Sequence, residues 1–417
     1  MSSKTEILSY SDLTFSDMRT VGIICEYNPF HNGHLHLLRE ARKHHDGQYV
    51  VCVLSSDFLQ RGDPSIINKF ERAKSAVING ADLVFELPVL YSCRNASEYA
   101  YYGVSLLDKV GICDTLLFGS ESGDKKILAD IADVLVNEPL EYKNMLKEYL
   151  SEGLSYPKSR SNSLEKHFGN TAVSDVIKSS NNILAVEYIS AIKNLNSPIQ
   201  YDTIKRIGAD YLDENLAASF SSATAIRSSI LTNGLDSVKN QIPDETYHLL
   251  QNIFLSLKPV SSAHLDTIMN YRLASLTSSD LLQYQNVTEG IENRISKAMS
   301  KHLGFEEMID YIASKRYPRT RIRRMLIHIL LDLKSEYLKN DISYARILYA
   351  SEKGKDLFDV INRNSTIPVF TSYRKFHDIA PASIKKLLDF EVKASNIYES
   401  LRKGLINSDY FHKFEIL

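Results

Sequence analysis

Short apolar runs alternate with helix-like segments from residue 21 onward. The apolar runs, which predict buried strands, are residues 21–25, 49–54, 83–86 and 115–118. The intervening segments that space their apolar side chains at helical intervals are residues 35–43, 69–79 and 96–109. Strands that alternate with crossover helices form a parallel sheet, so this part of the chain predicts an α/β fold.

The pattern changes farther along the chain. Residues 124–152 predict one or two helices, and the Ser-rich stretch LSYPKSRSNSLEKHFGN at 154–170 predicts a polar loop. A second α/β portion follows, with a helix at 182–194, a strand at 201–207 and a helix at 223–231.

Beyond these elements the spacing of apolar residues is almost wholly helical. The sequence therefore predicts three parts: an N-terminal extension at 1–20, a nucleotide-binding type of α/β domain at 21–242, and an all-helical domain at 243–417. We assign no function to the extension.

Composition narrows the classes of protein that fit. The 417 residues are 44% hydrophobic, without an apolar run near the roughly 18 residues that span a bilayer and without a hydrophobic signal segment. We therefore expect a cytoplasmic globular protein. A net charge of -2 means that any nucleic-acid surface must be a local patch. The spacing of the four cysteines favours free thiols over a disulfide or zinc framework.

The stretch CEYNPFHNGHLHLL follows the first predicted strand and opens the first predicted helix. Ligands of parallel sheets bind at the carboxyl ends of strands, and a helix start offers free N–H groups to an anion. His31 and His34 can donate ring N–H groups to phosphate, and Gly33 lets a nucleotide approach the backbone. The alternative to phosphate binding is that the histidines have only a structural role. A metal site would need a third ligand near the two histidines.

Seven blocks in this order resemble the bacterial tRNA(Met) cytidine acetate ligases of the H-x-G-H nucleotidyltransferase superfamily. The blocks begin with EYNPFHNGH and continue with SSDFLQRGDPSIINKFERAKSAVINGADLVFELP, LLFGSE, SSNNILAVEY, IKRIGADY, SSATAIRSSI and KRYPRTRIRRMLIHILL. The resemblance implies a Rossmann-like parallel sheet with a C-terminal all-helical domain. It also implies that ATP and acetate form acetyl-adenylate, whose acetyl group moves to N4 of the wobble cytidine of elongator tRNA(Met), giving N4-acetylcytidine.

The resemblance assigns roles to individual residues, with His31 and His34 as the catalytic pair. It implies ATP contacts for Ile24, Cys25, Glu26, Tyr27, Asn28, Pro29, Phe30, Asn32, Gly33, Leu35, His36, Leu37, Gly119, Asn182, Arg206, Ile207, Ser222, Thr224 and Arg227. Asn181 competes with Asn182 for one of these roles, and Ser222 is otherwise an ordinary N-cap. Ser56, Ser180 and Ala185 depart from the family pattern, which could narrow the pocket.

Two further polar segments suggest contacts with acetate or RNA. The segment SSDFLQRGDP follows the second predicted strand and offers Arg61 for acetate or RNA, although surface loops are often this polar. The segment KRYPRTRIRR crowds cations at a helix start, where the helix dipole disfavours them. We predict tRNA contacts for Lys315, Arg316, Tyr317, Arg319, Arg321, Arg323 and Arg324, with a solvated charged face as the alternative.

Two other classes of function remain open on the sequence. A small-molecule adenylyltransferase of the dinucleotide-cofactor type would share the ATP motifs without needing an RNA-binding domain. A non-catalytic RNA-binding protein is disfavoured by the presence of both histidines and Arg227. ATP use leads us to expect Mg²⁺, although no carboxylate cluster in the sequence identifies its ligands.

Overall fold

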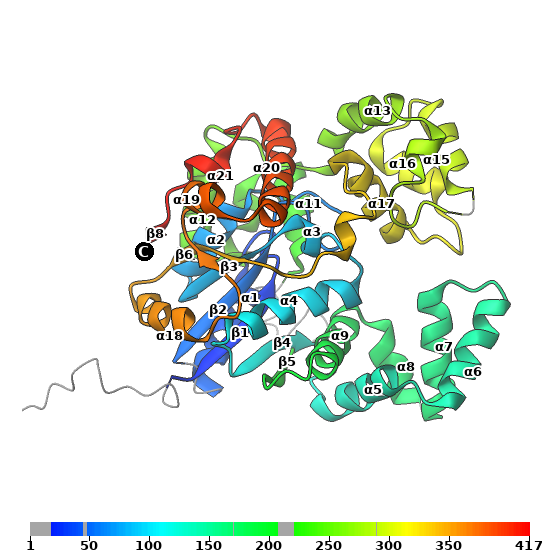
Figure 1. Ribbon diagram of the computed structural model, residues 1–417, viewed down its shortest axis with the longest axis horizontal. Coiled ribbons are helices and arrows are strands. Elements are labelled where there is room, and N and C mark those ends of the chain that lie inside the picture. The colour runs from blue at the N-terminus through cyan, green and yellow to red at the C-terminus, as the bar shows by residue number, and fades with distance from the viewer. Residues whose placement is uncertain (1–17, 45–47, 170, 207–220, 289) are drawn as a thin grey trace, which may run out of the picture.

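The computed structural model describes residues 18–44, 48–169, 171–206, 221–288 and 290–417. A sheet in the order β5-β4-β1-β2-β3-β6-β7 forms its centre, with β8 also paired to β6 (Figure 1). The strands are β1 (Thr20–Cys25), β2 (Tyr49–Ser55), β3 (Leu83–Leu87), β4 (Thr115–Ser120), β5 (Gln200–Lys205), β6 (Ala345–Ala350), β7 (Val369–Phe370) and β8 (Glu415–Ile416). Strands β1 to β5 pair in parallel, which confirms the predicted α/β sheet.

Helices cover both faces of the sheet. One face packs against α1 (Asn32–His44) and α2 (Lys69–Ile78), and the other against α4 (Ala96–Val110) and α9 (Ser180–Asn194). Strand β2 shows why every position of its sequence is apolar or small. Val50 and Cys52 join the core with α1 and α2, whereas Val51 and Val53 join the core with α4 and α9.

The predicted polar loop at 154–170 is wrong, because this stretch contains helix α7 (Tyr156–Phe168). Pro157 lies in its first turn, and Gly169 ends the helix with φ of 60°. Ser159 and Ser163 are buried on the inner face of the helix. Because two of the three buried residues of α7 are serines and only Leu164 is apolar, the sequence resembled a loop.

Two helical lobes lie on the same side of the sheet, to the right in Figure 1. One lobe contains α5 (Lys125–Asn137), α6 (Leu140–Ser151), α7 and α8 (Thr171–Lys178). The other contains α13 (Asp266–Ala274), α14 (Ser278–Leu281), α15 (Ile291–Met299), α16 (Phe305–Ile312) and α17 (Arg319–Leu331).

Among the described residues, no helix combines the length and apolarity needed to cross a bilayer. The four cysteines are free thiols, as predicted.

The remaining helical elements lie outside these two lobes. They are α3 (Val89–Ser92), α11 (Ala223–Asn233), η2 (Leu235–Gln241), α12 (Asp244–Phe254), η3 (Ser262–Leu265), η4 (Tyr337–Lys339), η5 (Lys353–Lys355), α18 (Asp356–Asn364), α19 (Tyr373–Ile379), α20 (Ala382–Arg402) and α21 (Ser408–Phe411). The C-terminal part is mainly helical, as predicted, but it also contributes β6, β7 and β8, which the sequence pattern did not reveal. Strand β6 pairs antiparallel with β3.

Buried charges join this C-terminal part to the sheet. Lys69 Nζ lies 2.5 Å from Glu86 Oε1 and 2.8 Å from Asp409 Oδ1. Arg346 of β6 pairs with the same two carboxylates. Glu391 of α20 accepts a hydrogen bond from the backbone N–H of Val89 at 2.7 Å. The last seventy or so residues therefore complete the core of the sheet domain.

Candidate active site

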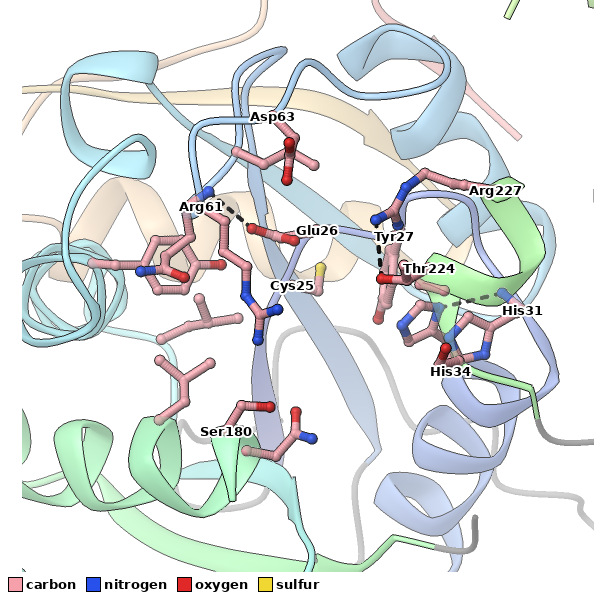
Figure 2. Close-up of a pocket in the computed structure, with 18 of the residues that line it drawn as sticks. Cys25, Glu26, Tyr27, His31, His34, Arg61, Asp63, Ser180, Thr224 and Arg227 are labelled. Atoms are coloured by element: carbon pink, nitrogen blue, oxygen red, sulfur yellow. Dashed lines mark hydrogen bonds between the residues drawn. The ribbon is translucent and has the colours of Figure 1, made fainter. Parts of the chain in front are cut away.

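A cavity of about 830 Å³ lies at the carboxyl ends of β1 and β4. The chain proceeds from β1 to β2 and β3 on one side and places β4 on the other side of β1, so this edge is a topological switch point. Side chains from the β1–α1 turn, the loop after β2, and the starts of α9 and α11 converge here (Figure 2). Residues of α17 complete the rim.

The β1–α1 turn fixes the tautomers of the two predicted catalytic histidines. The N–H of Gly33 donates to His31 Nδ1 at 3.0 Å, and the N–H of His31 donates to His34 Nδ1 at 3.2 Å. Each Nδ1 is therefore an acceptor, which leaves the proton of each neutral ring on Nε2. The rings stack with centroids 3.6 Å apart, and both line the cavity (Figure 2).

Both imidazoles are neutral at neutral pH. Burial, together with the positive charges of Arg206 and Arg227, lowers the pKa of His31 to about 3. Burial, His31 and Arg206 hold the pKa of His34 well below its ordinary value. The site thus presents two Nε2–H donors that carry no charge of their own.

The start of α1 has three N–H groups that are already bonded within the turn and so are not free for phosphate. The N–H of Gly33 is used by His31 Nδ1, and those of His34 and Leu35 donate to the carbonyl oxygen of His31 at 2.8 and 3.1 Å. The imidazole Nε2–H groups are the side-chain donors that this turn offers to an anion.

The predicted ATP-binding stretch at 24–37 divides into two groups. Cavity-lining members are Ile24, Cys25, Glu26, Tyr27, His31, His34 and Leu37. The remaining members are not among the lining residues. Asn28 accepts from the N–H of Ile66 at 2.7 Å, Asn32 donates to the carbonyl oxygen of Asn240 at 3.0 Å, and Phe30 is fully buried.

Gly119 and Arg206 meet at the carboxyl ends of β4 and β5. A Cβ at Gly119 would lie 3.1 Å from Cγ of Arg206, so the glycine makes room for this arginine. Both residues line the cavity, and their predicted contacts with nucleotide stay predictions. The neighbouring candidate Ile207 lies outside the described residues.

The start of α9 distinguishes the two asparagines that the sequence left as alternatives. Asn182 is buried, and its Oδ1 accepts from the N–H of Ser122 at 3.0 Å. Asn181 lines the cavity and donates through Nδ2 to Glu121 Oε1 at 2.6 Å. Asn181 therefore replaces Asn182 as the candidate for nucleotide contact.

The start of α11 brings Ser222, Thr224 and Arg227 to the cavity, where their ATP contacts stay a prediction. Ser222 is also the N-cap, because its hydroxyl accepts from the N–H of Ala225 at 3.2 Å. Arg227 donates to the carbonyl oxygen of Asn28 at 2.8 Å and to Thr224 Oγ1 at 3.2 Å. These contacts hold its guanidinium beside the histidine turn (Figure 2).

The cations around the start of α17 do not form one open surface. Arg323 pairs with Asp63 Oδ1 at 2.5 Å and with Glu306, and it lines the cavity. Arg319 pairs with Glu306 and Asp310. These carboxylates explain how cations are tolerated at a helix N-terminus.

The other predicted tRNA contacts differ in exposure. Lys315 and Arg316 are exposed, and Arg321 and Arg324 are half-buried. Tyr317 is only 7% exposed, and the guanidinium of Arg321 covers its ring at 4.6 Å from the centroid. The Tyr317 ring is therefore covered in this conformation, and the predicted contact of Tyr317 with tRNA stays a prediction.

Sequence reasoning missed an apolar wall and a positioning residue. The wall contains Leu59, Ala96, Phe118, Leu184 and Tyr188. These residues read as ordinary core positions, because only the folded chain shows that they face a cavity.

Arg72 of α2 is the positioning residue. Its Nη1 donates to the carbonyl oxygens of Glu26 at 2.7 Å and Ser55 at 2.8 Å, and its Nη2 donates to that of Ser56 at 2.8 Å. One buried guanidinium thus fixes the ends of β1 and β2 at the cavity. An arginine within a helix of mixed polarity carried no signal for this role.

Known proteins resemble this chain over nearly its whole length. Residues 18–411 match the HIGH Nucleotidyl Transferase family. A tRNA(Met) cytidine acetate ligase of Caldanaerobacter subterraneus subsp. tengcongensis is 40% identical over 400 residues, which cover 95% of this chain and 99% of that protein. A ligase of the same name from Clostridium perfringens is 37% identical over 407 residues, which cover 94% and 98% of the two chains.

A solved structure agrees with the sequence matches. The crystal structure of Thermotoga maritima TmcAL bound with alpha-thio ATP superposes with a TM-score of 0.88 at 29% identity, covering 96% of this chain and 100% of that chain. The chain therefore belongs to the tRNA(Met) cytidine acetate ligase family of the HIGH nucleotidyl transferases.

Proposed function

We propose that this protein is an ATP-dependent ligase that activates acetate as acetyl-adenylate and transfers the acetyl group to N4 of the wobble cytidine of elongator tRNA(Met). The observation that carries the proposal is the pair of neutral Nε2–H imidazoles beside Arg227 at the β1/β4 switch point. The relatives whose sequences match nearly the whole chain bear the name of that reaction.

The cavity suggests where the parts of ATP bind. The base and ribose lie near Gly119, Asn181 and Arg206, at the ends of β4 and β5. The triphosphate lies between the histidine pair and the start of α11, where Thr224 and Arg227 face it. This placement puts the α-phosphorus beside the two imidazole donors.

The residues then stabilise charge as the first step proceeds. An acetate oxygen attacks the α-phosphorus, the bond to the bridging oxygen breaks, and pyrophosphate leaves. Negative charge grows on the oxygens of the α-phosphate and of the leaving group, where His31, His34 and Arg227 supply hydrogen bonds. Because the donors are already oriented by the backbone, little reorganisation is needed during the reaction.

Mg²⁺ is part of the proposal only as a companion of ATP. In the described part of the chain, no cluster of three or more histidine, cysteine or carboxylate side chains is placed to hold a metal ion. Phosphate oxygens and water would therefore supply most of its ligands, as is common for Mg²⁺. The ion would reduce the charge of the triphosphate.

Acetate must be activated before it can react with cytidine. The exocyclic amine of cytosine is a poor nucleophile, because its lone pair is delocalised into the ring. An acyl group on AMP reacts with it, whereas free acetate does not. The tRNA substrate places this activity in the cytoplasm.

The test is acetyl transfer from labelled acetate. The purified protein is incubated with ATP, labelled acetate and either elongator tRNA(Met) or no RNA. We expect label in tRNA that digests to N4-acetylcytidine, and acetate-dependent pyrophosphate release in both reactions. Failure to label cognate tRNA, combined with adenylylation of a small molecule, would favour an adenylyltransferase instead.

A further inference from the structure

Most charged side chains of the cavity suit anionic ligands, but Glu26 does not. The described cavity wall carries Arg61, Arg206, Arg227 and Arg323 in addition to the two histidines. A carboxylate among them opposes the binding of both acetate and triphosphate. The Glu26 carboxylate would instead interact favourably with a ligand group that donates a hydrogen bond or loses a proton.

One oxygen of Glu26 is fixed and the other is open. The N–H of Gln60 donates to Oε1 at 2.9 Å, whereas no hydrogen bond to Oε2 occurs among the described residues. The residue directly follows β1, whose end is held by Arg72, so its backbone is fixed as well. Figure 2 shows the carboxylate between the loop that carries Arg61 and the helix that carries Arg227.

Asp63, the second carboxylate of the described cavity wall, differs from Glu26 because it forms an ion pair. It pairs with Arg323 at 2.5 Å, which neutralises it and ties it to α17. Glu26 makes no ion pair within 4 Å among the described residues. The two carboxylates thus give a functional candidate and a matched control in one cavity.

Acyl transfer to cytidine creates a need for such a group. The N4 amine must lose a proton when it becomes an amide, and carboxylates are natural partners for the cytosine amino group. The open side of Glu26 faces the same cavity as the imidazoles that would hold the α-phosphate, so an acyl group on that phosphate would lie within the space that Glu26 lines.

We propose that Glu26 is the acceptor for the N4 amino group of the wobble cytidine and takes its proton during acetyl transfer. The inference rests on the proposed function and names a residue for its second step.

Acetyl transfer forms one bond to the carbonyl carbon and breaks another. The N4 lone pair forms a bond to the carbonyl carbon of acetyl-adenylate, and the bond from that carbon to the phosphate oxygen breaks. AMP leaves with the bonding electrons. The proton from N4 passes to Oε2 of Glu26 and then to solvent, so the products are N4-acetylcytidine, AMP and a proton.

The surroundings of Glu26 make it a better base than an exposed glutamate. Burial raises the pKa of Glu26, although the N–H of Gln60 and the charge of Arg227 act in the opposite direction. The charged or titratable groups that face it from neighbouring elements are Arg61 and Asp63 of the loop after β2, Arg72 of α2, Tyr99 of α4, Tyr188 of α9 and Arg227 of α11.

The experiment compares the two half-reactions in Glu26→Gln. Acetate-dependent exchange of labelled pyrophosphate into ATP reports adenylate formation, and single-turnover labelling of elongator tRNA(Met) reports transfer. The amide oxygen of Gln keeps the hydrogen bond from Gln60 but cannot take a proton. We expect transfer to fall at least about 100-fold more than exchange, the usual effect of losing a general base.

The pH profile and two further variants sharpen the test. In the unchanged protein, the transfer rate should fall as pH drops through the raised pKa of Glu26, and Glu26→Gln should lack this acid limb. Glu26→Asp, which keeps the carboxylate one methylene shorter, should restore part of the transfer rate. Asp63→Asn removes a charge from the same cavity and should not lower transfer selectively.

Several outcomes would overturn the assignment. An equal loss of exchange and transfer, relieved by excess Mg²⁺, would make Glu26 a metal ligand. Equal selective loss in Asp63→Asn would make the effect one of cavity charge. If the unchanged protein forms N4-acetylcytidine and Glu26→Gln transfers at a normal rate, the assignment fails while the proposed function stands.

Discussion

At the scale of single residues, His31 and His34 owe their chemistry to backbone N–H groups. Each Nδ1 accepts one of these groups, so the ring proton stays on Nε2. Burial removes the positive charge that a free histidine would carry in part near neutral pH. The pair therefore acts through oriented donors rather than through a fixed cation.

Removing one donor should slow the first half-reaction. We predict that His34→Ala lowers acetate-dependent pyrophosphate release by about 10²-fold, the typical effect of one transition-state donor. The control is His248→Ala, because His248 of α12 is exposed and lies outside the cavity lining. Pyrophosphate release at the normal rate in His34→Ala would remove this residue from the phosphate site.

The protonation of His31 gives a second prediction at this scale. Its pKa of about 3 in the folded protein lies below the ordinary 6.5, so the folded protein resists a proton that the unfolded chain accepts. The contribution to the free energy of unfolding is present above pH 6.5 and declines by up to about 1.4 kcal/mol per unit as pH falls toward 3.

NMR titration of the ring protons checks this prediction. We expect no titration of His31 between pH 5 and 8 in the free protein, and an upward shift of its pKa when a non-hydrolysable ATP analogue is added. An ordinary midpoint near 6.5 in the free protein would mean that the ring is not buried as described.

At the scale of elements, the cations around the N-terminal turn of α17 fall into two groups: some form ion pairs within the protein, and others are exposed. Arg319 and Arg323 are neutralised by carboxylates of α16 and of the loop after β2, so they join the helical lobe to the cavity rim. Lys315, just before the helix, is exposed and makes no ion pair among the described residues. The sequence alone gave all these cations the same role.

Binding of tRNA should separate the two kinds of cation. We predict that Lys315→Ala weakens binding of elongator tRNA(Met) and reduces the slope of log K against log salt by about 0.7 to 0.9, the value for one phosphate contact. Arg319→Ala should change the slope less, because Glu306 and Asp310 already neutralise this residue. Filter binding at several salt concentrations measures both, and an equal slope change in both variants would contradict the distinction.

At the scale of the whole molecule, the two predicted domains share one core. Strand β6 extends the sheet beside β3, and α20 and α21 bring Glu391 and Asp409 to Lys69. Although burial alone would raise the pKa of Asp409, Lys69 and Arg346 hold it below its usual range. Residues on both sides of the predicted boundary at residue 242 therefore contribute to one sheet and one buried network of charges.

Breaking this buried network should destabilise the whole sheet domain. We predict that Asp409→Asn lowers the free energy of unfolding by about 3–5 kcal/mol, the usual effect of removing one partner of a buried ion pair. Asp359→Asn, at an exposed position of α18, should change it by about 0.5 kcal/mol or less. Urea unfolding followed by circular dichroism measures both.

The shape of the unfolding transition tests the shared core directly. If the C-terminal strands complete the sheet, calorimetry should show the sheet and its C-terminal strands unfolding together, and Asp409→Asn should shift that transition. A separate transition for the C-terminal part that moves alone in this variant would restore the predicted domain boundary.

Particular elements show how far the sequence could predict the fold. Strands β1 to β5 and helices α1, α2, α4, α9 and α11 were predicted to within a few residues, because their apolar spacing is regular. Helix α7 was missed because serines fill its buried face. Strand β6 was missed because the run ARILYA contains an arginine whose charge is balanced by residues distant in sequence.

The site was predictable where it follows a local motif. His31, His34, Gly119, Arg206 and Arg227 lie in short motifs at strand ends or helix starts, and all five line the cavity. The sequence left Asn181 and Asn182 as alternatives because neighbouring residues of a helix point in different directions, and packing shows that Asn181 is the one that faces the cavity.

By itself, the sequence determined the parallel sheet, the histidine turn at its edge and the family, because these depend on local periodicity and contiguous motifs. Only the tertiary structure decided that Glu26 is open while Asp63 is neutralised, since the partner of Asp63 is 260 residues away. Only the tertiary structure also showed that the C-terminal strands β6, β7 and β8 belong to the same sheet as the N-terminal strands. Electrostatics and packing act through space, so partners that are distant in sequence set the charge, exposure and direction of each side chain.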